Sequence, residues 1–231
     1  MTNLPAIPET TITALDNAVK SGAISAVGDG FARTVATANA IHTLRALLTP
    51  DVMKNIMELQ NSPLGFMTDR KDAPYSVDVV RDCIIEATLN GVSPFGNEFN
   101  IIASRCYITK NGMKHKLRDV QGLSYTITPG IPRMAGDGAI VAMAIEWTLN
   151  GKSDKKEINF AIRVNKGMGA DAIIGKATRK ASAWLFEAVT GQIVDDGEAN
   201  ESAPVTEVKA SVIEEPPAPE PTASETGDLP M

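Results

Sequence analysis

Basic side chains and one tyrosine share a face of a β-hairpin that the sequence predicts around Asn111-Gly112. Residues 99–110 and 113–120 alternate with a period of two, and Asn-Gly is a strong signal for a two-residue turn. In the register of such a turn, three pairs face each other: Thr109 and Lys114, Tyr107 and Lys116, Arg105 and Arg118. Opposed like charges cost up to roughly 1 kcal/mol, unless an anion lies between them. A tyrosine ring can stack on a base, which is worth ~1–3 kcal/mol. The face therefore predicts contacts to a phosphate backbone, with a solvated outer face as the alternative.

A second group of cations lies on a helix predicted over residues 170–190. Its apolar side chains form one broad stripe that includes Trp184, which we interpret as a core residue. The cations on the opposite side of the helix and just before it are Arg163, Lys166, Lys176, Arg179 and Lys180. We interpret these five as a second wall of the same groove, with a plain solvent-exposed face as the alternative.

The charge is distributed unevenly along the 231 residues, although the net charge is −6. Residues 1–100 carry a net charge of −4, with 7 Lys and Arg against 11 Asp and Glu. Residues 101–191 carry a net charge of +7, with 14 against 7, and residues 192–231 carry −9, with 1 against 10. Because salt screens charges over roughly 10 Å, the middle region can attract a polyanion despite the acidic total.

The order of predicted elements is helices, then strands, then a helix, which predicts an α+β fold in which a short antiparallel hairpin sheet packs against helices. Thr49-Pro50 and Ser76 begin helices, Asn90-Gly91 ends the second, and Gly138 to Leu149 pairs with Glu157 to Val164. Residues 1–40 are predicted to be weakly ordered or helical and to mediate oligomerisation. Residues 41–191 are predicted to form the core, and residues 192–231 are predicted to form a disordered acidic tail rich in Pro and Glu.

The sequence contains no set of residues that favours catalysis, a metal or a cofactor. Gly169 to Lys176 lacks the glycine spacing and the Ser or Thr of a phosphate loop. Cys106 and His115 are predicted near each other, but buried cysteine and satisfied histidine are far commoner than a nucleophile–base pair. A metal site is the less favoured interpretation of four aspartates: Asp69, Asp72, Asp78 and Asp82. Two isolated cysteines, no signal peptide and no membrane-length apolar run predict a cytoplasmic protein.

Three segments carry a resemblance to a known family. Residues 86–102 read EATLNGVSPFGNEFNII, residues 107–112 read YITKNG, and residues 174–185 read IGKATRKASAWL. In their order these resemble the helix and turn, the first hairpin and the late basic helix of phage recombinases of the RecT/Redβ class. The resemblance covers about residues 50–190.

The resemblance implies ATP-independent annealing of complementary single strands by oligomeric rings or helical filaments in a bacterial host cytoplasm. It further implies that one strand is held by its backbone in a basic groove, and that the protein works beside a phage exonuclease. The last residues, GDLPM, are similar to the acidic tip of bacterial single-strand-binding proteins and imply shared partners, with a solubilising tail as the alternative. Two other functions stay open: a passive single-strand-binding protein, and a phage assembly protein that does not bind DNA.

Overall fold

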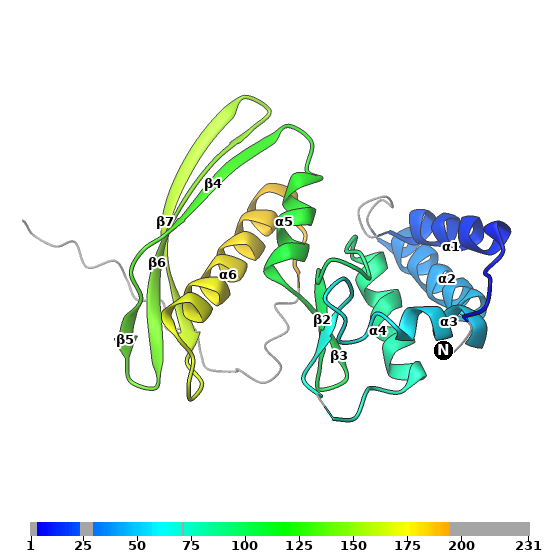
Figure 1. The fold of residues 1–231 in the computed structure, drawn as a ribbon. Helices are drawn as coiled ribbons and strands as arrows, with labels where there is room; N and C mark the ends of the chain where they lie inside the picture. The colour runs from blue at the N-terminus through cyan, green and yellow to red at the C-terminus, as the bar shows by residue number, and fades with distance from the viewer. Residues whose placement is uncertain (1–3, 24–29, 71, 195–231) are drawn as a thin grey trace, which may run out of the picture. The chain divides into compact units, whose positions relative to one another are not determined.

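The computed structural model describes residues 4–23, 30–70 and 72–194 (Figure 1). The described residues form an α+β fold in which antiparallel strand pairs pack against helices, as the sequence predicts. The helices and strands, in chain order, are α1 (Glu9–Gly22), α2 (Phe31–Leu47), α3 (Pro50–Met57), β1 (Met67–Thr68), α4 (Val77–Leu89), β2 (Phe99–Ile102), β3 (Arg105–Ile108), α5 (Lys110–Arg118), β4 (Leu123–Pro129), β5 (Arg133–Ala135), β6 (Gly138–Leu149), β7 (Lys152–Arg163) and α6 (Ala170–Thr190).

The N-terminal segment, predicted to be weakly ordered or helical, contains α1 and the start of α2 in its described part. Helices α1 and α2 pack closely because small residues meet at their contact. A Cβ atom added to Gly22 would lie 2.1 Å from the Cβ of Ala40 and 3.1 Å from Leu89 of α4. Ala18, Ala40 and Leu44 are buried in this packing. These helices therefore contribute to the core of the chain itself.

A small three-stranded sheet follows, in which β1 pairs parallel to β2 and β2 pairs antiparallel to β3. The strands β2 and β3 are joined by Ala103 and Ser104, which have φ angles of 50° and 63°. Two residues with positive φ form the tight turn that matches the twist of paired strands. Phe99 of β2 stacks on Phe66 with ring centroids 4.9 Å apart, and both rings are fully buried.

The hairpin predicted around Asn111-Gly112 is wrong, because residues 110–118 form the helix α5. Thr109 caps this helix: its Oγ1 accepts hydrogen bonds from the backbone N–H groups of Asn111 (3.2 Å) and Gly112 (3.4 Å). Gly112 is buried, and a Cβ atom at that position would lie 2.2 Å from the carbonyl oxygen of Glu98. The glycine is therefore needed for close packing of the helix on the preceding loop.

The second sheet is built on a long hairpin of β6 and β7, whose turn is Asn150-Gly151 with φ angles of 50° and 81°. Strands β4 and β5 pair with different parts of the other edge of β6. The predicted strand pair is confirmed, and β7 begins earlier than predicted, at Lys152. Most of the connection predicted as a polar loop is therefore strand.

Helix α6 packs on one face of this second sheet (Figure 1). It has the predicted bounds and ends at Gly191, whose φ of 70° is left-handed. The apolar stripe predicted for the helix is confirmed for its centre, which is buried together with alternate residues of β6. The buried residues are Val141, Met143 and Ile145 of β6, and Ile173, Ala177, Ala181 and Leu185 of α6.

Of the predicted acidic tail, residues 195–231 lie outside the described residues. None of the helices in the described ranges is both long and apolar enough to cross a membrane.

Candidate nucleic-acid interface

The ten residues predicted to contact nucleic acid fall into different environments in the structure. Strand β3 pairs with β2 and not with residues 113–120, so the predicted basic face of a hairpin is not formed. The two buried residues are Lys116 and Arg179. The half-buried residues are Tyr107, Lys176 and Lys180, and the exposed residues are Arg105, Lys114, Arg118, Arg163 and Lys166.

Three exposed cations follow one face of α5, and we call them the α5 ridge: Lys110, Lys114 and Arg118. Residues four apart lie on the same side of a helix, at steps of about 6 Å along its axis. Within the described residues, the structure shows no ion pair to any of the three. The ridge is therefore a continuous line of exposed positive charge.

Lys110 was not among the residues predicted to contact nucleic acid, because the predicted hairpin register placed it on the apolar face. The signal that would have found it is the spacing of the cations at positions 110, 114 and 118, which is helical.

Lys116 points to the opposite side of α5 and into the protein. Its Nζ donates a hydrogen bond to the carbonyl oxygen of Asn90, which follows the last turn of α4. The same Nζ lies 4.5 Å from the centroid of the Phe186 ring of α6. Burial lowers the pKa of the Lys116 amine to about 8. Lys116 therefore connects α4, α5 and α6, and it is a packing residue rather than an exposed phosphate contact.

This lowered pKa predicts how the stability of the fold depends on pH. Between about pH 8 and 10.5, the unfolded chain keeps the proton on Lys116 while the folded chain loses it. The unfolded state then binds more protons, so the free energy of unfolding contributed by Lys116 rises with pH across this window, by at most roughly 3 kcal/mol. Urea denaturation of the wild type and of Lys116→Met at pH 7.5 and 10 measures this. Between these two pH values, we expect the free energy of unfolding to rise more in the wild type than in the variant. An equal change in both proteins would contradict the lowered pKa of Lys116.

Arg179 and Tyr107 contact each other in the interior. The guanidinium Cζ lies 4.5 Å from the centroid of the tyrosine ring, and Arg179 is only 4% exposed. The prediction that Arg179 lies on the solvent side of α6 with Lys176 and Lys180 is therefore wrong. A planar guanidinium stacks well on an aromatic ring, and here the stack links α6 to β3. One face of the Tyr107 ring, which was predicted to stack on a base, is thus covered by Arg179.

Arg105 lies apart from the other predicted cations, exposed on β3 and paired with Ile102 of β2. The last four predicted cations gather around the end of β7 and the first half of α6: Arg163, Lys166, Lys176 and Lys180. The amines of Lys176 and Lys180 donate hydrogen bonds of 3.2 Å to the carbonyl oxygens of Arg163 and Ala161. In the described sheet, β7 pairs only with β6, so these carbonyls lie along its open edge. The two lysines cover that edge with charge, which discourages pairing with a further strand. Arg163 and Lys166 stay exposed beside them.

A network of polar side chains fixes α5 against the loop before β2. His115 Nδ1 lies 2.7 Å from Glu98 Oε2, and the same oxygen accepts a hydrogen bond of 2.7 Å from the backbone N–H of Ser93. The other ring nitrogen of His115 lies 3.3 Å from Asp119. These contacts hold α5 against the loop, and the exposed Asp119 directly follows Arg118 of the ridge.

The other candidate chemistry is accounted for by local structure. Asp69 accepts hydrogen bonds from the Tyr75 hydroxyl (2.7 Å) and the backbone N–H of Ala103 (3.1 Å), and the Tyr75 bond lowers its pKa. Asp78 pairs with Arg81, and Asp82 pairs with Arg45. No group of three His, Cys, Asp or Glu suited to a metal occurs in the part of the chain that the structure describes.

The thiol predicted near His115 is not activated. Burial raises the pKa of Cys106 far above neutral pH, so that its thiol stays protonated, and His115 is held by Glu98 instead. Two groups of exposed cations therefore remain as candidates for binding an anion: the α5 ridge and the residues at the end of β7.

Comparison of the chain with protein-family models, with curated proteins and with solved structures finds no match.

Proposed function

We propose that this protein binds single-stranded DNA along the α5 ridge and anneals complementary strands without ATP. The observation that carries the proposal is the line of three exposed cations on one side of α5, in a region whose net charge is +7. The resemblance of residues 86–112 and 174–185 to the RecT/Redβ class supports annealing as the outcome of binding. Holding a strand by its phosphates leaves the bases open to a second strand.

The electrostatics of α5 favour an anion at the ridge. Lys110 occupies the first turn, where the helix dipole is positive, so its charge is unfavourable by roughly 0.3–1 kcal/mol. A phosphate beside it removes that cost. Arg118 can bind one phosphate through two parallel hydrogen bonds. Each phosphate contact on a single strand lowers the slope of log affinity against log salt by about 0.7, so the ridge contributes a slope of about −2.

The acidic and basic parts of the chain also suggest how copies associate. Residues 1–100 carry a net charge of −4 and residues 101–191 carry +7. Docking of the first region of one copy on the second region of another would form a ring or a helical filament, as in the family that the chain resembles. We propose that the acidic C-terminal tail recruits a phage exonuclease or the host single-strand-binding machinery in the bacterial cytoplasm.

An annealing assay distinguishes the proposed function from its alternatives. Two complementary labelled oligonucleotides are mixed with the full-length protein in the absence of ATP, and duplex formation is followed over time. We expect faster annealing than occurs without protein. Tight binding with slowed annealing would instead identify a passive single-strand-binding protein. The absence of any salt-dependent affinity for DNA would identify a protein that does not bind DNA, such as a phage assembly protein.

A further inference from the structure

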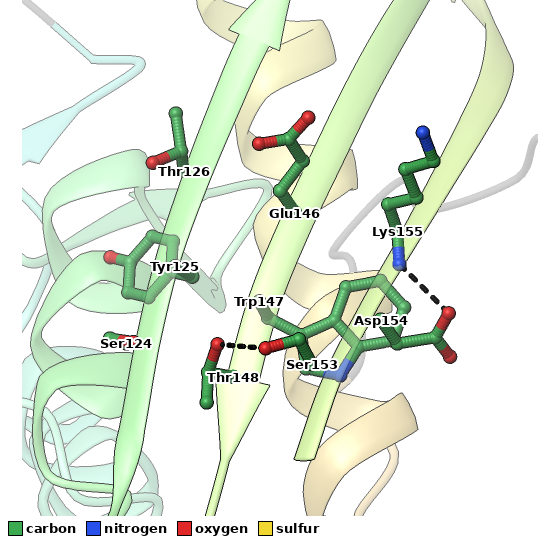
Figure 2. Close-up of a pocket in the computed structure, with 9 residues that line it drawn as sticks. All are labelled: Ser124, Tyr125, Thr126, Glu146, Trp147, Thr148, Ser153, Asp154 and Lys155. Carbon is green, nitrogen blue, oxygen red and sulfur yellow. Dashed lines mark hydrogen bonds between the residues drawn. The ribbon is translucent and has the colours of Figure 1, made fainter. Parts of the chain in front are cut away.

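One edge of the second sheet, that of β4, is open in the part of the chain that the structure describes. Figure 2 shows β4 at this edge, with β6 beside it and β7 beyond. The N–H groups of Asn150 and Gly130 donate hydrogen bonds to the carbonyl oxygens of Gly122 (3.1 Å) and Ala142 (2.7 Å). Because bonded pairs alternate along antiparallel strands, the even-numbered residues of β4 bond to β6. The odd-numbered residues therefore direct their N–H and C=O groups to the open edge.

Tyr125 and Ile127 hold the central main-chain groups of this edge. Toward the ends of β4, the N–H of Leu123 is bonded to the carbonyl oxygen of Val120 (3.3 Å), and Pro129 has no N–H. The side chains of Tyr125 and Ile127 are half-buried and pack against the core, which fixes the strand in place. The edge thus presents a pre-ordered row of donors and acceptors to another strand, and this lowers the entropy lost on pairing.

The edges of β4 and β7 differ in their protection against pairing. Natural edge strands avoid association through charged side chains, prolines or a covering element. Strand β7 has charged residues at position 152 and at positions 154–157, and Lys176 and Lys180 cover carbonyl groups at its end. Strand β4 has no charged residue, and its single proline is its last residue. Its exposed side chains between the two ends are small and carry hydroxyl groups: Ser124, Thr126 and Thr128. Of the two edges, that of β4 is therefore the one suited to pairing.

We infer that β4 pairs antiparallel with β4 of a second copy, so that the two sheets join across a two-fold axis at Thr126. Such a contact uses the same surface of both copies and is made by main-chain hydrogen bonds between edge strands. In the register that pairs all 7 residues of the strand, Tyr125 faces Ile127 of the other copy and Thr126 faces its own counterpart. Ser124 then faces Thr128. Pairs of an aromatic with a β-branched residue and pairs of threonines are both favourable across strands, so β4 is complementary to itself.

A solvated edge and a contact between unlike edges are the alternatives. Pairing of β4 with β7 of another copy would give an open-ended assembly, and the lysines along β7 oppose it. The inference goes beyond the proposed function and does not rest on it, because the strands pair without DNA. The contact also differs from docking of the acidic region of one copy on the basic region of another, which salt screens. Neutral β4 strands should pair at high salt as well.

Cysteine cross-linking of the full-length protein tests the register, with Thr126→Cys and Thr128→Cys compared under mild oxidation at about 0.5 M salt, which screens charge-based docking. In the inferred register, the two thiols at position 126 face each other with Cα atoms about 4.5 Å apart, within reach of a disulfide. The two thiols at position 128 are four residues out of register, about 13 Å apart. We expect a covalent dimer from Thr126→Cys alone. Cys83 and Cys106 are present in both variants, so they do not affect the comparison. Equal yields of dimer, or none from Thr126→Cys, would overturn the inference.

Sedimentation equilibrium at the same salt provides a second test without cross-linking. Thr126→Lys places two like charges opposite each other at the two-fold axis and should weaken dimerisation by roughly fivefold. Thr128→Lys adds the same charge to the same exposed face but opposite Ser124, so it should have a smaller effect. Thermal denaturation checks that both variants are folded. A wild type that stays monomeric at every concentration, or that grows into open-ended assemblies, would overturn the inference, as would equal dimerisation constants for folded Thr126→Lys and Thr128→Lys.

Discussion

Replacing Lys114 and Arg118 with glutamate is expected to weaken binding of a single-stranded oligonucleotide by about 100-fold at moderate salt. Each residue offers one charge-assisted contact to a phosphate, worth about 1.5 kcal/mol or more, and the two losses together correspond to that change in affinity. Repulsion by the new carboxylates adds to it. Anisotropy of a labelled oligonucleotide measures the effect. Both side chains are exposed and without ion pairs among the described residues, so the fold should tolerate the change.

The matched control reverses two exposed cations that lie outside the ridge, Lys54 of α3 and Arg133 of β5. The double variant Lys54→Glu and Arg133→Glu has the same net charge as the ridge variant. A loss of affinity that depended on net charge alone would be equal in the two proteins. We expect the control to retain most of the wild-type affinity, and equal losses would refute the placement of the strand on α5.

Substitution of Gly112 with alanine is expected to destabilise the protein by about 2–3 kcal/mol or more. The added Cβ would lie 2.2 Å from the carbonyl oxygen of Glu98, 2.9 Å from Ile108 and 3.0 Å from Val92. Two of these neighbours are buried side chains and the third is backbone, so none can move without disturbing the core, and such overpacking typically costs 1–3 kcal/mol. Chemical denaturation measures the change. DNA binding should fall with it, because Gly112 positions the ridge.

Gly175 of α6 provides the matched control, since it is also a helical glycine. A Cβ at Gly175 has no neighbouring atom within 4 Å. Alanine there should stabilise the helix by about 0.5–1 kcal/mol, because glycine has the lower helix propensity. We therefore expect Gly112→Ala to lower the free energy of unfolding and Gly175→Ala to raise it. If Gly112→Ala left the free energy of unfolding unchanged, α5 would not pack against Glu98, Ile108 and Val92 as described.

The parts of the fold that were predicted correctly are those where several local signals agree. The bounds of α6 follow from a long apolar stripe ended by Gly191, and α3 begins where Thr49 caps it before Pro50. The pair β6 and β7 follows from alternation over many residues. Long periodic segments of this kind constrain the choice between helix and strand because a single misplaced residue does not change the pattern.

The Asn-Gly dipeptides show where local signals are insufficient. Asn90-Gly91 ends a helix with a left-handed glycine at φ 76°, and Asn150-Gly151 forms a hairpin turn. Asn111-Gly112 lies inside a helix, where the glycine serves a contact with Glu98. The same two residues thus have three structural roles. Only tertiary packing, which a local pattern does not contain, separates the third role from the second.

The candidate site was predicted in part. The positive region of the chain could be recognised from charge alone, and Lys114 and Arg118 are exposed as the prediction requires. Lys116 and Arg179 could not be separated from them by sequence, because both are charged residues within basic segments. Each is instead buried against an aromatic ring, and Lys116 also bonds to a backbone carbonyl. A long basic side chain can use its apolar stem and its charge in this way when a ring and an acceptor lie within reach.

Acetylation footprinting of the wild-type protein tests most directly whether a single strand lies on α5. The reactivity of each lysine is measured by mass spectrometry with and without a saturating single-stranded oligonucleotide. We predict that Lys110 and Lys114 lose reactivity when the strand is bound, that exposed Lys54 keeps its reactivity, and that buried Lys116 reacts slowly in both states. Unchanged reactivity of Lys110 and Lys114 in a complex that has demonstrably formed would contradict the proposed interface.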